Sequence, residues 1–173
     1  MEKKELIGLL NECGAIKFGH FVLTSGAVSD YYIDIKKAST NPKVLKKIVK
    51  KMAEYTKDYE LLAGMELGAV PLVVALSLET NIPYVIIRKE KRDHGTGKQI
   101  EGSDVKGKKV LIIEDVTTSG GSVLKSIDII RENNGIVDEV IVVVDRESGT
   151  KEKLKAVDVN FIPLLSISDI IKK

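Results

Sequence analysis

The sequence contains little cysteine, proline or tryptophan, with one cysteine, four prolines and no tryptophan among 173 residues. A single cysteine cannot form an intrachain disulfide. Cys13 lies in an apolar-periodic segment, so we expect a small buried side chain and a reducing compartment. No apolar run approaches the ~20 residues of a membrane-spanning helix, and Met-Glu-Lys-Lys-Glu at the start leads into no signal-peptide pattern. We therefore expect a soluble cytoplasmic protein without a membrane partner.

The chain also lacks an excess of either charge. Its 27 Lys and Arg against 25 Asp and Glu give a net charge of +2, too small for the basic surface of a nucleic-acid-binding protein. The hydrophobic share of 43% and the charged share of 30% argue against disorder. With no internal repeat or low-complexity tract, the length fits one compact domain over residues 1–173.

From about residue 60 onward, short apolar strands alternate with helices. This order predicts an α/β fold with a mostly parallel central sheet and helices on both faces. Ligands bind such sheets at the carboxyl ends of the strands, so the loops after the first four strands would share one rim. The expected strands are Leu61–Met65, Tyr84–Ile87, Lys109–Glu114, Glu139–Val144 and Asn160–Pro163, and the expected helices are Val70–Glu79, Gly120–Glu132 and Ser166–Ile171.

The first part of the chain follows a different pattern. We expect a helix over residues 2–13, an extended segment with turns over 18–26, a strand over 31–35, and a helix from Pro42 to about Thr56. Because residues 1–40 precede the alternation, we expect them to form a small N-terminal cap over the rim of an α/β core that spans 41–173.

The most informative segment is 110–123, Val-Leu-Ile-Ile-Glu-Asp-Val-Thr-Thr-Ser-Gly-Gly-Ser-Val. An apolar strand leads into Glu114 and Asp115, then into a turn rich in hydroxyls and glycine, then into an amphipathic helix. Small residues at a helix N-terminus, where the effective charge is roughly +0.5, suit a bound phosphate. The two acids would accept hydrogen bonds from sugar hydroxyls or lie near a metal. Helix capping explains Ser119 or Ser122, but it does not explain the acids, so the segment favours a phosphorylated ribose.

This segment resembles the phosphoribosyl diphosphate binding motif of the phosphoribosyltransferases. The resemblance implies the type I phosphoribosyltransferase fold, with a small N-terminal hood and a long flexible catalytic loop. It assigns binding of phosphoribosyl diphosphate to Glu114, Asp115, Val116, Thr117, Thr118, Ser119, Gly120, Gly121 and Ser122.

The long segment after the second expected strand carries many cations. Arg-Lys-x-x-basic-x-His-Gly from Arg88 resembles the mobile loop of orotate phosphoribosyltransferases, which reaches into the neighbouring subunit of a dimer. The resemblance implies a homodimer with shared active sites, in which Arg88, Lys89, Arg92 and His94 bind the diphosphate.

Two roles within this loop stay open. Arg92 aligns with the usual catalytic lysine of the family, and the adjacent Lys91 would be able to share its task. His94 would act either by transferring a proton or by stabilising charge.

Two further segments resemble the same family. Phe18–Gly26 with Ser29–Asp34 resembles its cap, where Tyr31 and Tyr32 would either line the base pocket or form a hydrophobic cap core. Arg146 matches the arginine that contacts orotate, and the resemblance gives Thr118 the same substrate. Thr24 and Gly68 stand where many members carry lysine.

Together the motifs imply an orotate phosphoribosyltransferase, a glycosyltransferase of pyrimidine biosynthesis that makes orotidine 5′-phosphate and diphosphate from its two substrates. The resemblance implies Mg²⁺ held mainly by substrate and water, and it assigns catalysis to Arg92, His94 and Asp115. The alternatives are a phosphoribosyltransferase for another nucleobase and a non-catalytic regulator that binds phosphoribosyl diphosphate. A Walker-type phosphatase is disfavoured because Gln99 follows Lys98 where Ser or Thr is required.

Overall fold

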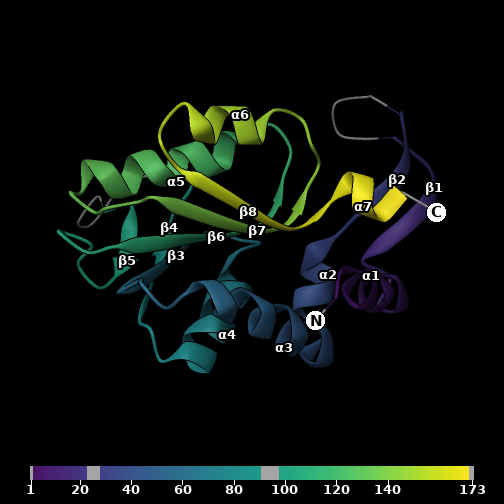
Figure 1. Cartoon of the computed structure of the whole chain (residues 1–173), viewed down its shortest axis with the longest axis horizontal. Helices are drawn as coiled ribbons and strands as arrows, with labels where there is room; N and C mark the ends of the chain where they lie inside the picture. The colour runs from purple at the N-terminus through teal and green to yellow at the C-terminus, as the bar shows by residue number, and fades with distance from the viewer. Residues whose placement is uncertain (1, 23–27, 91–97, 172–173) are drawn as a thin grey trace.

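A six-stranded sheet between two layers of helices forms the centre of the computed structural model, which describes residues 2–22, 28–90 and 98–171 (Figure 1). The strand order is β5-β4-β3-β6-β7-β8, and all pairs are parallel except β4 with β5. The strands are β3 (Leu61–Met65), β4 (Tyr84–Ile87), β5 (Ile100–Gly102), β6 (Val110–Thr117), β7 (Glu139–Asp145) and β8 (Asn160–Ser166).

Helices cover both faces of this sheet. On one face lie α3 (Pro42–Met52) and α4 (Val70–Thr80), with the short 3-10 helix η1 (Ala53–Tyr55) between them in the chain. On the other lie α5 (Gly121–Glu132) and α6 (Thr150–Lys155) (Figure 1). Because both faces are covered, the central strands are continuous apolar runs and not alternating ones.

The N-terminal segment forms the expected cap at one end of the sheet. It consists of α1 (Lys3–Glu12), an antiparallel hairpin of β1 (Ile16–Val22) and β2 (Val28–Ile33), and α2 (Ile35–Ser39). The C-terminal helix α7 (Ile167–Ile171) lies beside it (Figure 1). An ion pair of 2.6 Å between Lys3 Nζ and Asp169 Oδ2 joins the first and last helices.

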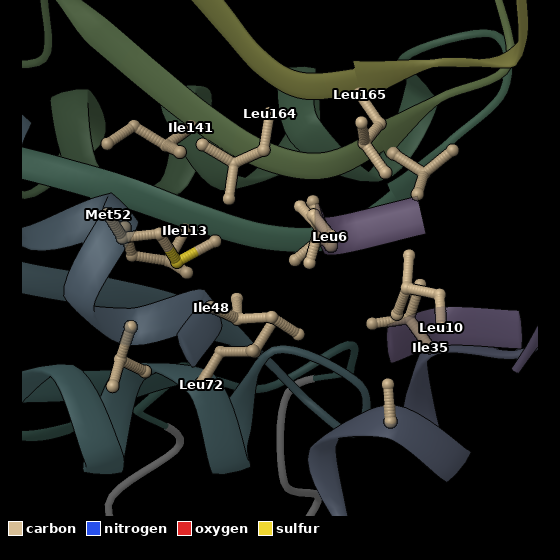
Figure 2. Packing of buried hydrophobic residues seen from close by; sticks show 14 of the residues in the cluster. Leu6, Leu10, Ile35, Ile48, Met52, Leu72, Ile113, Ile141, Leu164 and Leu165 are labelled. Carbon is tan, nitrogen blue, oxygen red and sulfur yellow. The ribbon is translucent and has the colours of Figure 1, made fainter. Parts of the chain in front are cut away.

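Two hydrophobic clusters, one on each face of the sheet, hold these layers together. The larger cluster contains side chains of the cap, of α3 and α4, and of β6, β7 and β8, so the cap and the sheet share one core. Figure 2 labels ten of its members, which are Leu6, Leu10, Ile35, Ile48, Met52, Leu72, Ile113, Ile141, Leu164 and Leu165.

The structure corrects several boundaries. β6 does not end at Glu114 but continues to Thr117, because β7 is long enough to pair with it as far as Asp145. Asp115 therefore lies within the strand and not after it. In the cap, the described part of the extended segment belongs to strand β1, and β2 ends at Ile33, so that Ile35 begins a helix.

Sequence reasoning missed three short elements, which are β5, α2 and α6. Each has six residues or fewer, and such segments depend on tertiary packing more than on periodicity. At the other end, β8 extends to Ser166, so α7 starts at Ile167. Within the described ranges, no helix combines the length and the apolar character that crossing a membrane requires.

Candidate active site

The carboxyl ends of β3, β4, β6 and β7 meet at one edge of the sheet, as their parallel register requires. Met65 pairs with Ile87, and Thr117 pairs with Asp145. A pocket of about 300 Å³ opens at this edge, and we call it the rim pocket. Among the described residues it is lined by Lys36, Met65, Glu66, Leu67, Gly68, Lys89, Glu114, Asp115, Val116 and Ser122.

The loop between β3 and α4 lies directly against the acids of β6. The peptide bond between Glu66 and Leu67 is cis. A Cβ atom placed on Gly68 would lie 2.1 Å from Asp115 Oδ2 and 2.5 Å from Asp115 Cγ. A side chain at this position, such as the lysine that the family resemblance leads one to expect, would therefore require Asp115 to move.

The two acids are held by the backbone of their own strand. The Asp115 amide donates to Glu114 Oε1 at 3.0 Å, and the Val116 amide donates to Asp115 Oδ1 at 2.8 Å. Glu114 is buried, whereas Asp115 is half-buried. Both line the rim pocket, which leaves Asp115 the more accessible carboxylate for a ligand.

Burial changes the protonation of Glu114. It is the main cause that raises the pKa of this carboxyl to about 8, and the neighbouring Asp115 carboxylate raises it further, while the Asp115 amide and Lys89 act in the opposite direction. This shift favours the protonated form of Glu114 in the free protein at neutral pH. A neutral carboxyl donates as well as accepts hydrogen bonds, and it does not repel an anionic ligand.

The segment 117–122, which we call the phosphate turn, connects β6 to α5. Thr117 is buried, and its hydroxyl lies 3.0 Å from the Thr150 hydroxyl, away from solvent. Thr118 and Ser119 are exposed. Gly120 opens α5 with φ of +79°, a left-handed conformation that favours glycine, and exposed Gly121 and Ser122 form the first turn of the helix.

The predicted cations divide between two places. Lys89 lines the rim pocket, and its amide donates to Glu66 Oε1 at 2.9 Å. The Lys125 ammonium donates to the carbonyl oxygen of Lys89. Arg88 instead pairs with Glu101 on β5 at 3.6 Å and does not line the pocket.

Lys36, which sequence reasoning did not single out, brings a second cation from the cap into the rim pocket. Its Nζ lies 3.8 Å from Asp34 Oδ1, beyond hydrogen-bond distance, so the ammonium is only loosely held. Asp34 Oδ1 is buried and has no hydrogen-bond partner among the described residues. No motif identified Lys36, because α2 is too short to predict.

Arg146 lies in a different cavity, of about 450 Å³, between the cap and the end of β7. We call it the cap cavity. The guanidinium carbon lies 5.5 Å from the centre of the Tyr31 ring, a cation–π arrangement. Tyr31 also packs against the large hydrophobic cluster, whereas Tyr32 is exposed. Tyr31 thus packs against the hydrophobic core and also lines the cap cavity, and its role in a base pocket stays a prediction.

Three residues of the predicted catalytic loop, Lys91, Arg92 and His94, lie outside the described ranges, as does Thr24 of the cap. Two residues that contact the phosphate turn were also missed by sequence reasoning. Thr150 and Lys153 belong to α6, and only the fold brings them near residues 117–119.

Comparison with known proteins gives this geometry a family. Residues 35–169 match the model of the phosphoribosyl transferase domain. The orotate phosphoribosyltransferase of Pyrococcus horikoshii is 54% identical over 174 residues, covering 98% of this chain and 94% of the relative. The chain belongs to the orotate phosphoribosyltransferase family. This confirms the resemblance inferred from the motifs.

Solved structures agree with this assignment. The orotate phosphoribosyltransferase of Aeropyrum pernix superposes with a TM-score of 0.87 at 31% identity, covering 96% of both chains. That of Mycobacterium tuberculosis, in complex with 5-phospho-alpha-D-ribosyl 1-diphosphate, gives 0.81 at 30% identity, covering 97% of this chain and 98% of that one. The predicted type I fold of this family, with its mostly parallel sheet and flanking helices, is therefore confirmed.

The protonation of Glu114 predicts an unusual dependence of stability on pH. Between about pH 4.5 and pH 8 the unfolded chain has lost the Glu114 proton while the folded chain keeps it, so folding stability falls as pH rises through this range. Glu114→Gln removes this titration. Relative to the wild type, the free energy of unfolding of this variant should therefore increase by a few kcal/mol as the pH rises across this range.

Denaturant unfolding at several pH values from about 5 to 9 measures this difference. Glu79→Gln, at an exposed position of α4, is the matched control and should follow the wild-type curve. A Glu114→Gln curve that stays parallel to that of the wild type over the whole range would contradict the assigned protonation.

Proposed function

We propose that this chain transfers the 5-phosphoribosyl group from phosphoribosyl diphosphate to orotate, forming orotidine 5′-phosphate and diphosphate in pyrimidine biosynthesis. One observation carries this proposal: the pair Glu114 and Asp115 lies beside the phosphate turn at the edge of a parallel sheet, in a chain of the orotate phosphoribosyltransferase family. Displacement at the sugar C1 passes through an oxocarbenium-like state, and it needs no covalent nucleophile. The protein's task is to position both substrates and to neutralise the leaving diphosphate.

The ribose phosphate would bind at the phosphate turn and the acids. Backbone amides and hydroxyls of residues 117–122 would hold the 5′-phosphate, helped by the N-terminus of α5. Asp115 would accept hydrogen bonds from the ribose hydroxyls. Glu114, protonated in the free protein, would donate or accept as the ligand requires.

The diphosphate would bind the cations of the rim pocket. Lys36 and Lys89 line it and come from different elements, the cap and the segment after β4. We further propose that Arg92 and His94, with Arg88 at the base of their loop, complete this binding across the interface of a homodimer. Asp115 holds the ribose while Arg92 and His94 would act on the leaving group.

Magnesium fits this pocket as an ion held mainly by the substrate and water. Asp115 offers carboxylate oxygens, the ligand type that Mg²⁺ prefers. No group of three or more His, Cys, Asp or Glu side chains is placed to hold a metal among the residues that the structure describes. When bound, Mg²⁺ would neutralise negative charge on the diphosphate.

Orotate would bind between the cap and the core. The Arg146 guanidinium suits a carboxylate or paired carbonyl oxygens, and Thr118 is exposed on the phosphate turn, the first residue after β6. We also propose that residues 1–173 act as one domain, because side chains of the cap and of the sheet share a hydrophobic core. We further propose that this domain acts in the cytoplasm.

The direct test is an assay of the purified protein with phosphoribosyl diphosphate, Mg²⁺ and a panel of nucleobases. We expect turnover with orotate, followed as loss of its absorbance, and none with adenine, hypoxanthine or uracil. Turnover with another base alone would reassign the substrate, and binding of phosphoribosyl diphosphate without turnover of any base would indicate a regulator.

Lys36 gives a test of the rim pocket. Lys36→Met should raise the KM for phosphoribosyl diphosphate roughly tenfold, the factor expected for loss of a charged hydrogen bond, with little change for orotate. Lys37→Met is the matched control, because the Lys37 ammonium lies beside Gly14 instead. Equal effects of the two substitutions would reject a specific role of Lys36.

Arg146 gives a test of orotate recognition. Arg146→Ala should raise the KM for orotate at least tenfold and leave that for phosphoribosyl diphosphate nearly unchanged, because the guanidinium lies in the cap cavity and not in the rim pocket. Arg146→Lys keeps the charge but not the planar guanidinium, so its KM for orotate should lie between those of the wild type and Arg146→Ala. Steady-state kinetics with each substrate varied in turn would show a parallel rise in both constants if the role is wrong.

A further inference from the structure

We propose that the short helix α6 is the positioning element of the phosphate turn, and that Thr150 and Lys153 fix the orientation of its peptide groups. This inference rests on the proposed function, because it assigns a purpose to the turn as the site of the 5′-phosphate. Neither residue lines the rim pocket, so both would act through the backbone of the turn.

Three consecutive carbonyl groups of the turn are held from the same side. The Thr117 carbonyl accepts from the Arg146 amide at 2.9 Å, the Thr118 carbonyl from the Thr150 hydroxyl at 3.1 Å, and the Ser119 carbonyl from the Lys153 ammonium at 2.7 Å. All three donors belong to the segment 146–153, which leads from the end of β7 into α6.

The planarity of the peptide group turns these bonds into a constraint on the amides. In a trans peptide the N–H group points opposite to the C=O group that precedes it. Carbonyls directed at the segment 146–153 therefore direct the amides of Thr118, Ser119 and Gly120 away from it. Among the described residues these three amides have no acceptor. These three N–H groups are therefore available to donate hydrogen bonds to a bound anion.

Packing supports the same arrangement. Thr150 is buried, and its hydroxyl also lies 3.0 Å from the buried Thr117 hydroxyl, so one side chain contacts two successive residues of the turn. Gly120 lies against Thr150, since a Cβ atom there would come within 3.2 Å of Thr150 Cγ2. The turn thus has a fixed support on the side opposite to its free amides.

The experiment uses the full chain and ribose 5-phosphate as the probe. Thr150→Val keeps the shape of the side chain but removes its hydroxyl, and Lys153→Met removes the ammonium from an exposed position. We expect each to raise the Kd of ribose 5-phosphate, measured by calorimetry, and the KM for phosphoribosyl diphosphate by about five- to tenfold, as loss of one hydrogen bond would. The KM for orotate should change less than about twofold, well below that effect.

Two matched variants separate positioning from folding and from charge. Thr150→Ser retains the hydroxyl and should restore wild-type affinity for ribose 5-phosphate. Lys151→Met removes a neighbouring charge of the same helix, and it should leave that affinity unchanged. A wild-type Kd in both Thr150→Val and Lys153→Met, or an equal loss in Lys151→Met and Lys153→Met, would overturn the inference.

The same measurements distinguish a failure of the positioning role from a failure of the proposed function. If the wild type binds ribose 5-phosphate and the α6 variants weaken that binding, the positioning role stands even where orotate is not turned over. If the wild type turns over orotate and the variants bind the probe normally, the enzyme assignment stands and the positioning role falls.

Discussion

The parallel pairing of β6 with β3 on one side and β7 on the other is the constraint on which the site depends. Its register places Glu114, Asp115 and the phosphate turn beside the loop that follows β3 and the segment that follows β7. Side chains alternate along a strand, so a shift of one residue would exchange the faces on which Glu114 and Asp115 lie. The apolar residues 110–113, buried on both faces of the sheet, stabilise this register because any shift would cost their packing.

Charge in the rim pocket is arranged around this strand. Burial favours the protonated, neutral form of Glu114, which leaves Asp115 as the main negative charge beside the phosphate turn. A side chain at Gly68 would require Asp115 to move, so in this arrangement the positive charge comes from other elements. Lys36 and Lys89 provide it from the cap and from the end of β4. A ligand with several negative charges would therefore connect the cap to the sheet.

The central sheet and the acidic pair with its turn could be predicted from the sequence, because the central strands are long apolar runs and the acids with their turn form a contiguous motif. The predictions that failed concern strand ends and short elements. The end of β6 at Thr117 depends on pairing with β7, and α6 has only six residues, so neither leaves a periodic signal. Lys36 and Thr150 reach the site only through tertiary structure, and no spacing in the sequence relates them to the motif. Arg92 and His94 stay predictions, since they lie outside the described residues.

The position of α6 has a consequence for how this fold tolerates change. Surface connections between strands usually accept insertions and deletions with little effect. The crossover from β7 to β8 would be an exception, because its helix holds the carbonyl groups of Thr118 and Ser119 from outside the cavities. Lengthening or trimming that crossover would alter recognition of the sugar phosphate while every residue that touches it remained in place. Attempts to graft tags, shorten loops or permute the chain should leave this connection intact.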